Sequence, residues 1–182
     1  MLAESSASLL SRVRNGHTEA RQEILNLYQA RFRHWVQLRM SPQMQAHVSI
    51  EDLIREALNR SLDYLIQFKQ VREGSFVVYF RQQLLHALEN LVNPDSAVGS
   101  KSVTTDEIDL NKLADTDELA RYESALSQLQ DIQREAVILK LELHLDNTTI
   151  AAALDCPSAN AARNLVVRSL LRLSELMTGG SA

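Results

Sequence analysis

The chain has 182 residues, of which 45% are hydrophobic and 23% charged, with a formal net charge of −4 at pH 7. This length allows one domain or two small ones, with two as our preference, and the low content of five glycines and three prolines predicts an all-α fold. No apolar stretch approaches the roughly 18 residues that span a bilayer, and no signal peptide is recognisable, so we expect a cytoplasmic protein without membrane insertion.

Residues 1–93 predict a bundle of four helices, the first of them short and ended by Gly16. The second begins at Thr18 and is ended by Ser41-Pro42. The third begins at Ser49, whose hydroxyl can cap the helix with Asp52 three residues on. The fourth follows the loop 69–74 and runs from Ser75 to Val92. Apolar residues at helical spacing define the core side of the last two helices, namely Ile54, Leu58, Leu62 and Leu65, then Phe76, Phe80, Leu84, Leu88 and Leu91.

Residues 94–118 predict an exposed acidic linker and the domain boundary. Between positions 94 and 120 the chain carries two Lys/Arg and seven Asp/Glu, with many Ser, Thr and Asn and no sustained helical period. An alternative is that Ile108, Leu110 and Leu113 pin this segment to one domain. A linker of this length leaves open whether the two domains lie apart or pack together.

Residues 119–178 predict a smaller helical domain that ends in a helix pair. Two helices, over 119–129 and 132–143, come first. The ends of the pair are encoded by a cap at Asp146 or Asn147, a stop at Pro157 and a second cap at Ser158. The small residues 151–153 permit the close helix contact that a helix-turn-helix requires.

The last helix separates apolar from polar residues. Its predicted buried stripe is Ala162, Leu165, Val166, Leu170 and Leu173. Its predicted outer face is Asn160, Arg163, Asn164, Val167 and Arg168. Arginine can pair with guanine edges or phosphates and asparagine with adenine, so this face suits a DNA groove. By spacing alone, an ordinary helical hairpin with a solvated polar face remains the alternative.

Motifs in both parts of the chain resemble those of one protein family. In the C-terminal part the residues that match the motif are Leu129, Arg134-Glu135-Ala136-Val137, Ile150-Ala151, Leu154, Ser158, Arg168 and Leu173. In the N-terminal part the matching segments are "LLSRVRNGHTEARQEILNLY", "IEDLIREAL" and "GSFVVYFRQQL". These segments resemble regions four and two, respectively, of bacterial extracytoplasmic-function (ECF) sigma factors. The resemblance covers nearly the whole chain in the family's order.

This resemblance implies a dissociable promoter-specificity subunit, with a region-two-like bundle (1–93) and a region-four-like helix-turn-helix domain (119–178). The implied partners are core RNA polymerase and promoter DNA, with an anti-sigma factor or another regulator as a further candidate. The implied polymerase-binding residues are Asp52, Arg55, Glu56 and Asn59. The implied minus-ten residues are Lys69, Gln70, Arg72, Tyr79, Arg81 and His86. The implied minus-thirty-five residues are Asn160, Arg163, Asn164 and Arg168.

The chain also departs from the family pattern. Arg55 replaces the usual glutamine and Tyr79 the usual tryptophan. In the stretch that follows, the family tends to show Asn, Asp and then Arg with further basic residues, whereas this chain has His86, Asn90 and Asn93 and then "PDSAVGS". Loss of basic side chains there should weaken both promoter melting and non-specific DNA binding. The alternative function is therefore a sigma-like protein–protein interaction module that has lost much of its DNA binding. Net acidity and the outward Val167 and Leu171 favour this alternative.

The sequence gives no indication of an enzyme. It lacks a Gly-rich phosphate loop, a nucleophile beside a plausible base and a carboxylate pair suited to acid–base work. The five histidines show no spacing typical of a metal site. The single cysteine, Cys156, lies beside an apolar helix and is expected to be a small buried residue. We therefore expect no catalytic residues, metal or cofactor.

Overall fold

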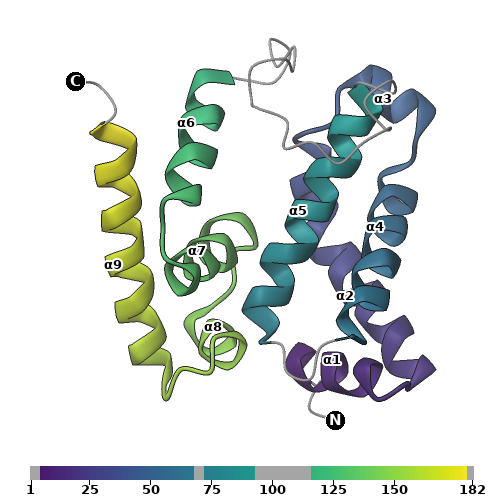
Figure 1. The fold of residues 1–182 in the computed structure, drawn as a ribbon, viewed down its shortest axis with the longest axis horizontal. Coiled ribbons are helices and arrows are strands. Elements are labelled where there is room, and N and C mark those ends of the chain that lie inside the picture. The colour runs from purple at the N-terminus through teal and green to yellow at the C-terminus, as the bar shows by residue number, and fades with distance from the viewer. Residues whose placement is uncertain (1–4, 68–71, 93–115, 180–182) are drawn as a thin grey trace.

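The computed structural model describes residues 5–67, 72–92 and 116–179, and the regular structure in these ranges is entirely helical (Figure 1). The elements are α1 (Ser6–Arg14), α2 (Thr18–Gln37), α3 (Pro42–His47), α4 (Ile50–Leu65), α5 (Glu73–Val92), α6 (Thr116–Ser127), α7 (Asp131–Val137), the π-helical segment η3 (Ile138–Glu142), α8 (Asn147–Ala153) and α9 (Ala159–Thr178). The all-α prediction is confirmed. Most of the expected linker, including Ile108, Leu110 and Leu113, lies outside the described ranges, and its last three residues belong to α6.

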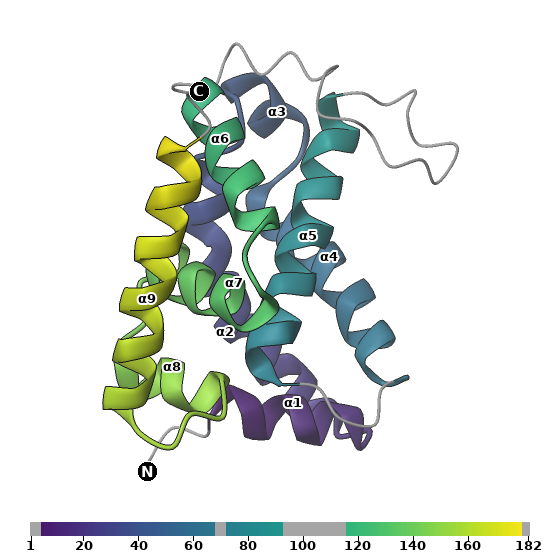
Figure 2. The ribbon, with the colours of Figure 1, turned by 60° about the vertical axis from the view of Figure 1, so that its left-hand side comes forward.

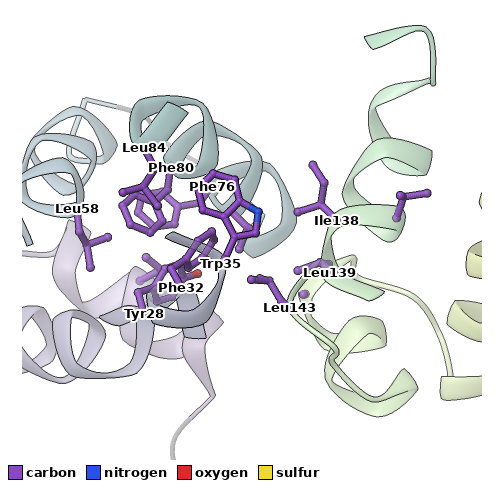
Figure 3. Packing of buried hydrophobic residues seen from close by; sticks show 14 of the residues in the cluster. Tyr28, Phe32, Trp35, Leu58, Phe76, Phe80, Leu84, Ile138, Leu139 and Leu143 are labelled. Carbon is purple, nitrogen blue, oxygen red and sulfur yellow. The ribbon is translucent and has the colours of Figure 1, made fainter. Parts of the chain in front are cut away.

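The N-terminal bundle (α1–α5) is built around aromatic side chains of α2 and α5. Tyr28 and Phe32 of α2 meet Phe76 and Phe80 of α5, and the Phe32 and Phe80 rings contact edge to face with centroids 4.8 Å apart (Figure 3). Burying several large rings supplies much of the hydrophobic stabilisation of a small bundle. The predicted core stripes of α4 and α5 are buried, with Leu91 half-buried.

Local capping signals position most helix ends of this bundle. Gly16 has φ +86° and the His17 N–H donates to the Arg12 carbonyl at 3.1 Å, which is the glycine-dependent stop predicted for α1. The Ser49 hydroxyl accepts from the Asp52 N–H at 3.0 Å, as predicted. Ser41 caps a short additional helix, α3, by accepting from the Met44 N–H at 3.3 Å. The segment Ser41-Pro42 therefore starts a helix as well as following one, which the sequence analysis missed.

Helix α5 begins at Glu73, two residues earlier than predicted. The Glu73 carboxylate is buried and pairs with Arg31 Nη1 of α2 at 2.9 Å. Arg31 also donates through Nη2 to the hydroxyl of Ser6 at 3.3 Å. An acidic residue in the first turn suits the helix dipole, and this pair ties the start of α5 to α1 and α2. Gly74, expected in a loop, therefore lies inside the helix.

The C-terminal bundle (α6–α9) contains one irregular turn. In η3 the Leu143 N–H bonds to the Ile138 carbonyl, five residues back, at 3.2 Å. Such widened turns are rare and frequently found at functional sites. Ile138 and Leu139 are buried, whereas Leu141 is exposed. The sequence predicted a regular helix over 132–143, so this widened turn corrects that expectation.

The two bundles lie side by side (Figures 1 and 2). Their buried apolar side chains form one continuous hydrophobic core. Helix α5 is the central element, because it packs on α4 and, through aromatic side chains, on α2 on one side, and on α7 and η3 on the other. Trp35 lies on the side of the aromatic cluster that faces Ile138, Leu139 and Leu143 (Figure 3). The structure therefore has the two parts packed together, which the sequence left open.

Candidate nucleic-acid interface

Helices α8 and α9 form a closely spaced pair with a cap at each start. The Asp146 carboxylate accepts from the N–H groups of Thr148 and Thr149 at 2.9 Å each, and these bonds lower the pKa of Asp146. The Ser158 hydroxyl accepts from the Ala161 N–H at 3.1 Å. Both predicted caps are confirmed.

The stop between the two helices differs from the prediction. Helix α8 ends at Ala153, and Asp155 adopts φ +54° while the Cys156 N–H bonds to the Ala151 carbonyl at 2.8 Å. This is a helix-ending turn with an aspartate in the left-handed position, where a short polar side chain is tolerated. Pro157 follows this turn and does not itself end the helix. Cys156 is half-buried, less buried than expected.

Helix α9 presents the polar face that the sequence predicted. The side chains on this face are exposed, namely Asn160, Arg163, Asn164, Val167 and Arg168. On the opposite side Ala162, Val166 and Leu173 are buried, and Leu165 and Leu170 are half-buried. Arg168 Nε donates to the Asn164 carbonyl at 3.3 Å, which holds that side chain along the helix surface. A capped helix with outward asparagine and arginine has the residue types that read base edges.

The predicted polymerase-binding residues lie along one face of α4. Asp52, Arg55 and Glu56 are exposed, and Arg55 Nη1 lies 2.9 Å from Asp52 Oδ1. Glu56 pairs with Arg60 in the same way. Asn59 is half-buried and accepts from Arg21 Nη2 at 3.0 Å. The face is thus a surface of alternating charges, accessible to a partner, with each acidic residue already beside an arginine.

The predicted minus-ten residues that the structure describes do not all lie on one surface. Lys69 and Gln70 lie outside the described ranges. Tyr79 stacks on Tyr64 of α4 with ring centroids 4.9 Å apart, and the exposed His86 lies 3.2 Å from Glu89. Arg81 lies two residues from Tyr79, which is about 200° around a helix of 3.6 residues per turn. It therefore points to the opposite side of α5, toward the C-terminal bundle.

Arg81 is the centre of a cluster between the two bundles, made of Trp35, Arg81, Tyr122, Glu123 and Glu142. Arg81 Nε lies 2.7 Å from Glu142 Oε2, and Arg81 Nη2 lies 2.5 Å from Glu123 Oε1. Glu142 also accepts from the Trp35 indole at 2.5 Å and from the Tyr122 hydroxyl at 2.8 Å. The side chains of Arg81 and Glu142 are only 5% and 6% exposed. In this structure Arg81 is buried, and both edges of its guanidinium group are occupied by carboxylates.

Burial and charge act together in this cluster. Burial alone would lower the pKa of Arg81, but Glu142 and Glu123 outweigh it and raise that pKa. Burial and the neighbouring Glu142 raise the pKa of the Tyr122 hydroxyl. Beside the cluster, Arg39 stacks on the Trp35 ring with 3.9 Å from guanidinium carbon to centroid, and burial lowers its pKa. Arg81 is therefore firmly charged and neutralised within the protein.

Arg72 makes a second contact between the bundles. Its Nη2 lies 3.1 Å from Glu135 Oε1, which also accepts from the Ser75 hydroxyl at 2.8 Å. The Glu135 side chain is 4% exposed, and burial raises its pKa against the opposing effects of Ser75 and Arg72. A Cβ at Gly74 would lie 2.6 Å from both Glu135 Oε2 and Leu154 Cδ2. The absence of a side chain at position 74 is what lets α7 and α8 approach α5 this closely.

The residues that join the bundles were not predicted from the sequence. Trp35 and Glu142 are 107 positions apart, so no local pattern could pair them. One signal was present: Arg81 follows Phe80 and lies within the apolar pattern of α5. A charge in such a position requires a buried partner.

The described residues contain no group of three or more His, Cys, Asp or Glu that could hold a metal ion. Within the same residues, the length and apolarity that membrane crossing demands are not combined in any helix. No family model matches the chain, and neither the curated proteins nor the solved structures contain a match.

Proposed function

We propose that this protein is an ECF-type sigma factor that directs RNA polymerase to promoters with minus-ten and minus-thirty-five elements. The observation that carries the proposal is the outer face of α9, where exposed asparagine and arginine side chains follow a Ser158 cap while the opposite face is buried. The order of the sequence motifs along the chain supports the same function.

In this function α9 would enter the major groove of the minus-thirty-five element. Arg163 and Arg168 would pair with guanine edges or phosphates, and Asn160 and Asn164 with adenine. The exposed residues of α4 would contact core polymerase. Because Arg81 is neutralised internally, the described minus-ten candidates that remain accessible are Tyr79, His86 and part of Arg72.

The test is reconstituted transcription with the purified full chain, core polymerase and a promoter library. We expect transcripts that depend on the protein and share an upstream sequence element. A matched reaction with the Arg163→Ala/Arg168→Ala variant should lose them, whereas Arg33→Ala, a change at an exposed arginine of α2, should retain them. Absence of any protein-dependent transcript, with polymerase active on a control factor, would remove the proposal.

A second candidate is a sigma-like module that binds protein partners without binding DNA. Two observations favour it: Arg72 and Arg81 are occupied by carboxylates, and Val167 and Leu171 of α9 are 48% and 62% exposed. Exposed apolar side chains one turn apart suit a protein contact. Co-purification of polymerase with the chain, combined with no affinity for any duplex at low salt, would favour this module over the sigma factor.

A further inference from the structure

Helices α4 and α5 pack against each other and carry two stacked tyrosines at the surface of the N-terminal bundle (Figures 1 and 2). The rings of Tyr64 and Tyr79 are within 20° of parallel, and their centroids are 4.9 Å apart. Tyr64 is 42% exposed, and Tyr79 is half-buried. We call these two residues the tyrosine pair. Two large rings brought together at the surface form an apolar patch of the kind that binds ligands.

The tyrosine pair lies on the side of α5 that faces away from the C-terminal bundle. Arg81 points toward that bundle, and Tyr79 lies about 200° away from it around the helix. Gln82 and His86 follow Tyr79 by three and seven residues, which is close to one and two helical turns, and both are exposed. These side chains therefore share an accessible side of α5 with the tyrosine pair, and no rearrangement of the two bundles is needed to reach it.

The charges next to the tyrosine pair are already balanced within the protein. Asp63 precedes Tyr64, and its Oδ1 lies 2.8 Å from Arg21 Nη2. Arg60, one turn before Tyr64, pairs with Glu56. Because these two arginines are each beside a carboxylate, a nucleic-acid strand gains little from phosphate contacts here. A ligand at this place is held mainly by its contact with the rings.

Stacked aromatic rings suit the unpaired bases of a single strand. Base–aromatic stacking is a main source of affinity in single-strand sites, and it accepts any base because every base has a π face. Stacked rings also restrict each other's rotation, so Tyr64 and Tyr79 lose less side-chain freedom when a base binds. Tyr64 thus both enlarges the aromatic surface and fixes the orientation of Tyr79.

We propose that Tyr64, to which the motif resemblance assigns no role, extends the single-strand site of Tyr79, and that the tyrosine pair binds unpaired DNA bases by stacking. Single-stranded DNA as the ligand rests on the proposed function. Stacking carries the binding at this place, and phosphate charge contributes little. The affinity therefore falls when position 64 loses its ring, and it depends only weakly on salt concentration.

Binding is measured by fluorescence anisotropy with a labelled oligothymidylate of about twelve nucleotides, a length that single-strand sites cover, and with an abasic oligonucleotide of equal length. The wild type should prefer the thymidylate by about tenfold. Tyr64→Leu should lose this preference, whereas Tyr64→Phe, which keeps the ring, should retain it. The matched control is Ile66→Ala, which shortens another exposed apolar side chain at the end of α4 and should bind as the wild type does.

A spectroscopic signal separates stacking from a purely structural role of Tyr64. An oligothymidylate with one central 2-aminopurine should lose fluorescence when it is saturated with the wild type or with Tyr64→Phe, because a ring stacks on the reporter base. Saturation with Tyr64→Leu should quench it less. Circular dichroism verifies the fold of each variant. If Tyr64→Leu does not fold, Tyr64→Met takes its place, since methionine is flexible and fills irregular space without a ring.

Two results would overturn the inference. One is equal affinity of the wild type for the thymidylate and the abasic oligonucleotide, which is also the result expected if the tyrosine pair binds a protein instead of DNA. The other is a folded variant without a ring at position 64 that keeps the full preference for bases and the full quenching.

The proposed function fails separately from this inference. If the wild type gives transcripts with core polymerase while Tyr64→Leu keeps the full preference for bases, the proposed function stands and the role of Tyr64 does not. If the wild type gives no transcripts but binds the thymidylate through the ring of Tyr64, the role of Tyr64 stands and the proposed function does not.

Discussion

Helices α9 and α5 both carry arginines for which the sequence predicted DNA contacts. The fold leaves those of α9 exposed but buries Arg81 of α5. On α9, Arg163 and Arg168 are exposed. On α5, Arg81 is buried against Glu123 and Glu142. The residue type is the same, so the difference lies in what each helix packs against. A cationic side chain becomes a DNA contact only if the rest of the protein leaves it without an internal anion.

The cause is the number of packed faces on each helix. Helix α9 packs on α6, α7 and α8 and leaves its far side to solvent. Helix α5 packs on the N-terminal bundle and again on α7 and η3. A charge on a helix covered from two sides must be paired, since an isolated buried charge is very costly.

The largest expected effect tests this difference through stability. Arg81→Met should lower the free energy of unfolding by about 3–5 kcal/mol, because Glu142 would remain buried without its partner. The same change on the other surface, Arg163→Met, should stay within about 0.5 kcal/mol. Urea titration of Trp35 fluorescence measures both. Equal midpoints for the two variants would show that the buried pair does not stabilise the protein.

A smaller effect is expected in DNA binding. Arg163→Ala should weaken binding to the preferred minus-thirty-five duplex by about 1–3 kcal/mol if this arginine reads a base. Arg60→Ala, an arginine change on α4, serves as the control and should bind the duplex almost as the wild type does. Fluorescence anisotropy at several salt concentrations separates base reading from phosphate contact. Equal binding by both variants would contradict the role of the α9 face.

The start of α9 is expected to contribute about 1 kcal/mol. Ser158→Ala removes the hydroxyl that caps the helix, and loss of an N-cap typically costs this much. Thermal unfolding should detect it, with Ser174→Ala, an exposed change in the same helix, as the control. Because the cap holds the first turn of α9, Ser158→Ala should also bind the duplex more weakly. A Tm of Ser158→Ala equal to that of the control would mean that packing alone fixes the helix start.

The smallest expected effect is a pH dependence of the contact between the bundles. Burial raises the pKa of Glu135 above its value in the unfolded chain, so the folded state holds more protons than the unfolded state between these two values. Stability contributed by this group therefore falls as pH rises through that window and grows as pH is lowered into it from neutral. Glu135→Gln should flatten this slope in urea titrations at successive pH values. A slope identical to that of the wild type would assign the dependence to other groups.

Much of the helical architecture could be predicted because its signals are local. The stop at Gly16, the caps at Ser49, Asp146 and Ser158 and the buried stripe of α9 follow from residues within one or two turns of each other. The prediction failed where distant residues intervene. Helix α5 starts at Glu73 because Arg31, 42 positions away, compensates its buried carboxylate.

The polar face of α9, by contrast, was predictable since it requires only that apolar and polar residues alternate at helical spacing. The cluster around Arg81 was not, because its carboxylates come from α6 and η3. The spacing of apolar residues along the sequence indicates which side of a helix is apolar. This spacing does not indicate which other helix will cover the remaining sides.

The sequence by itself determined that the chain folds as helices, where most of them begin and end, and which side of α9 is polar, since these depend on propensity, capping and spacing within a few turns. Only the tertiary structure decided that the two bundles pack together and that Arg81 is neutralised by Glu123 and Glu142. The physical reason is that pairing between distant charges depends on how the helices are brought together in space, and this arrangement is set by the whole core.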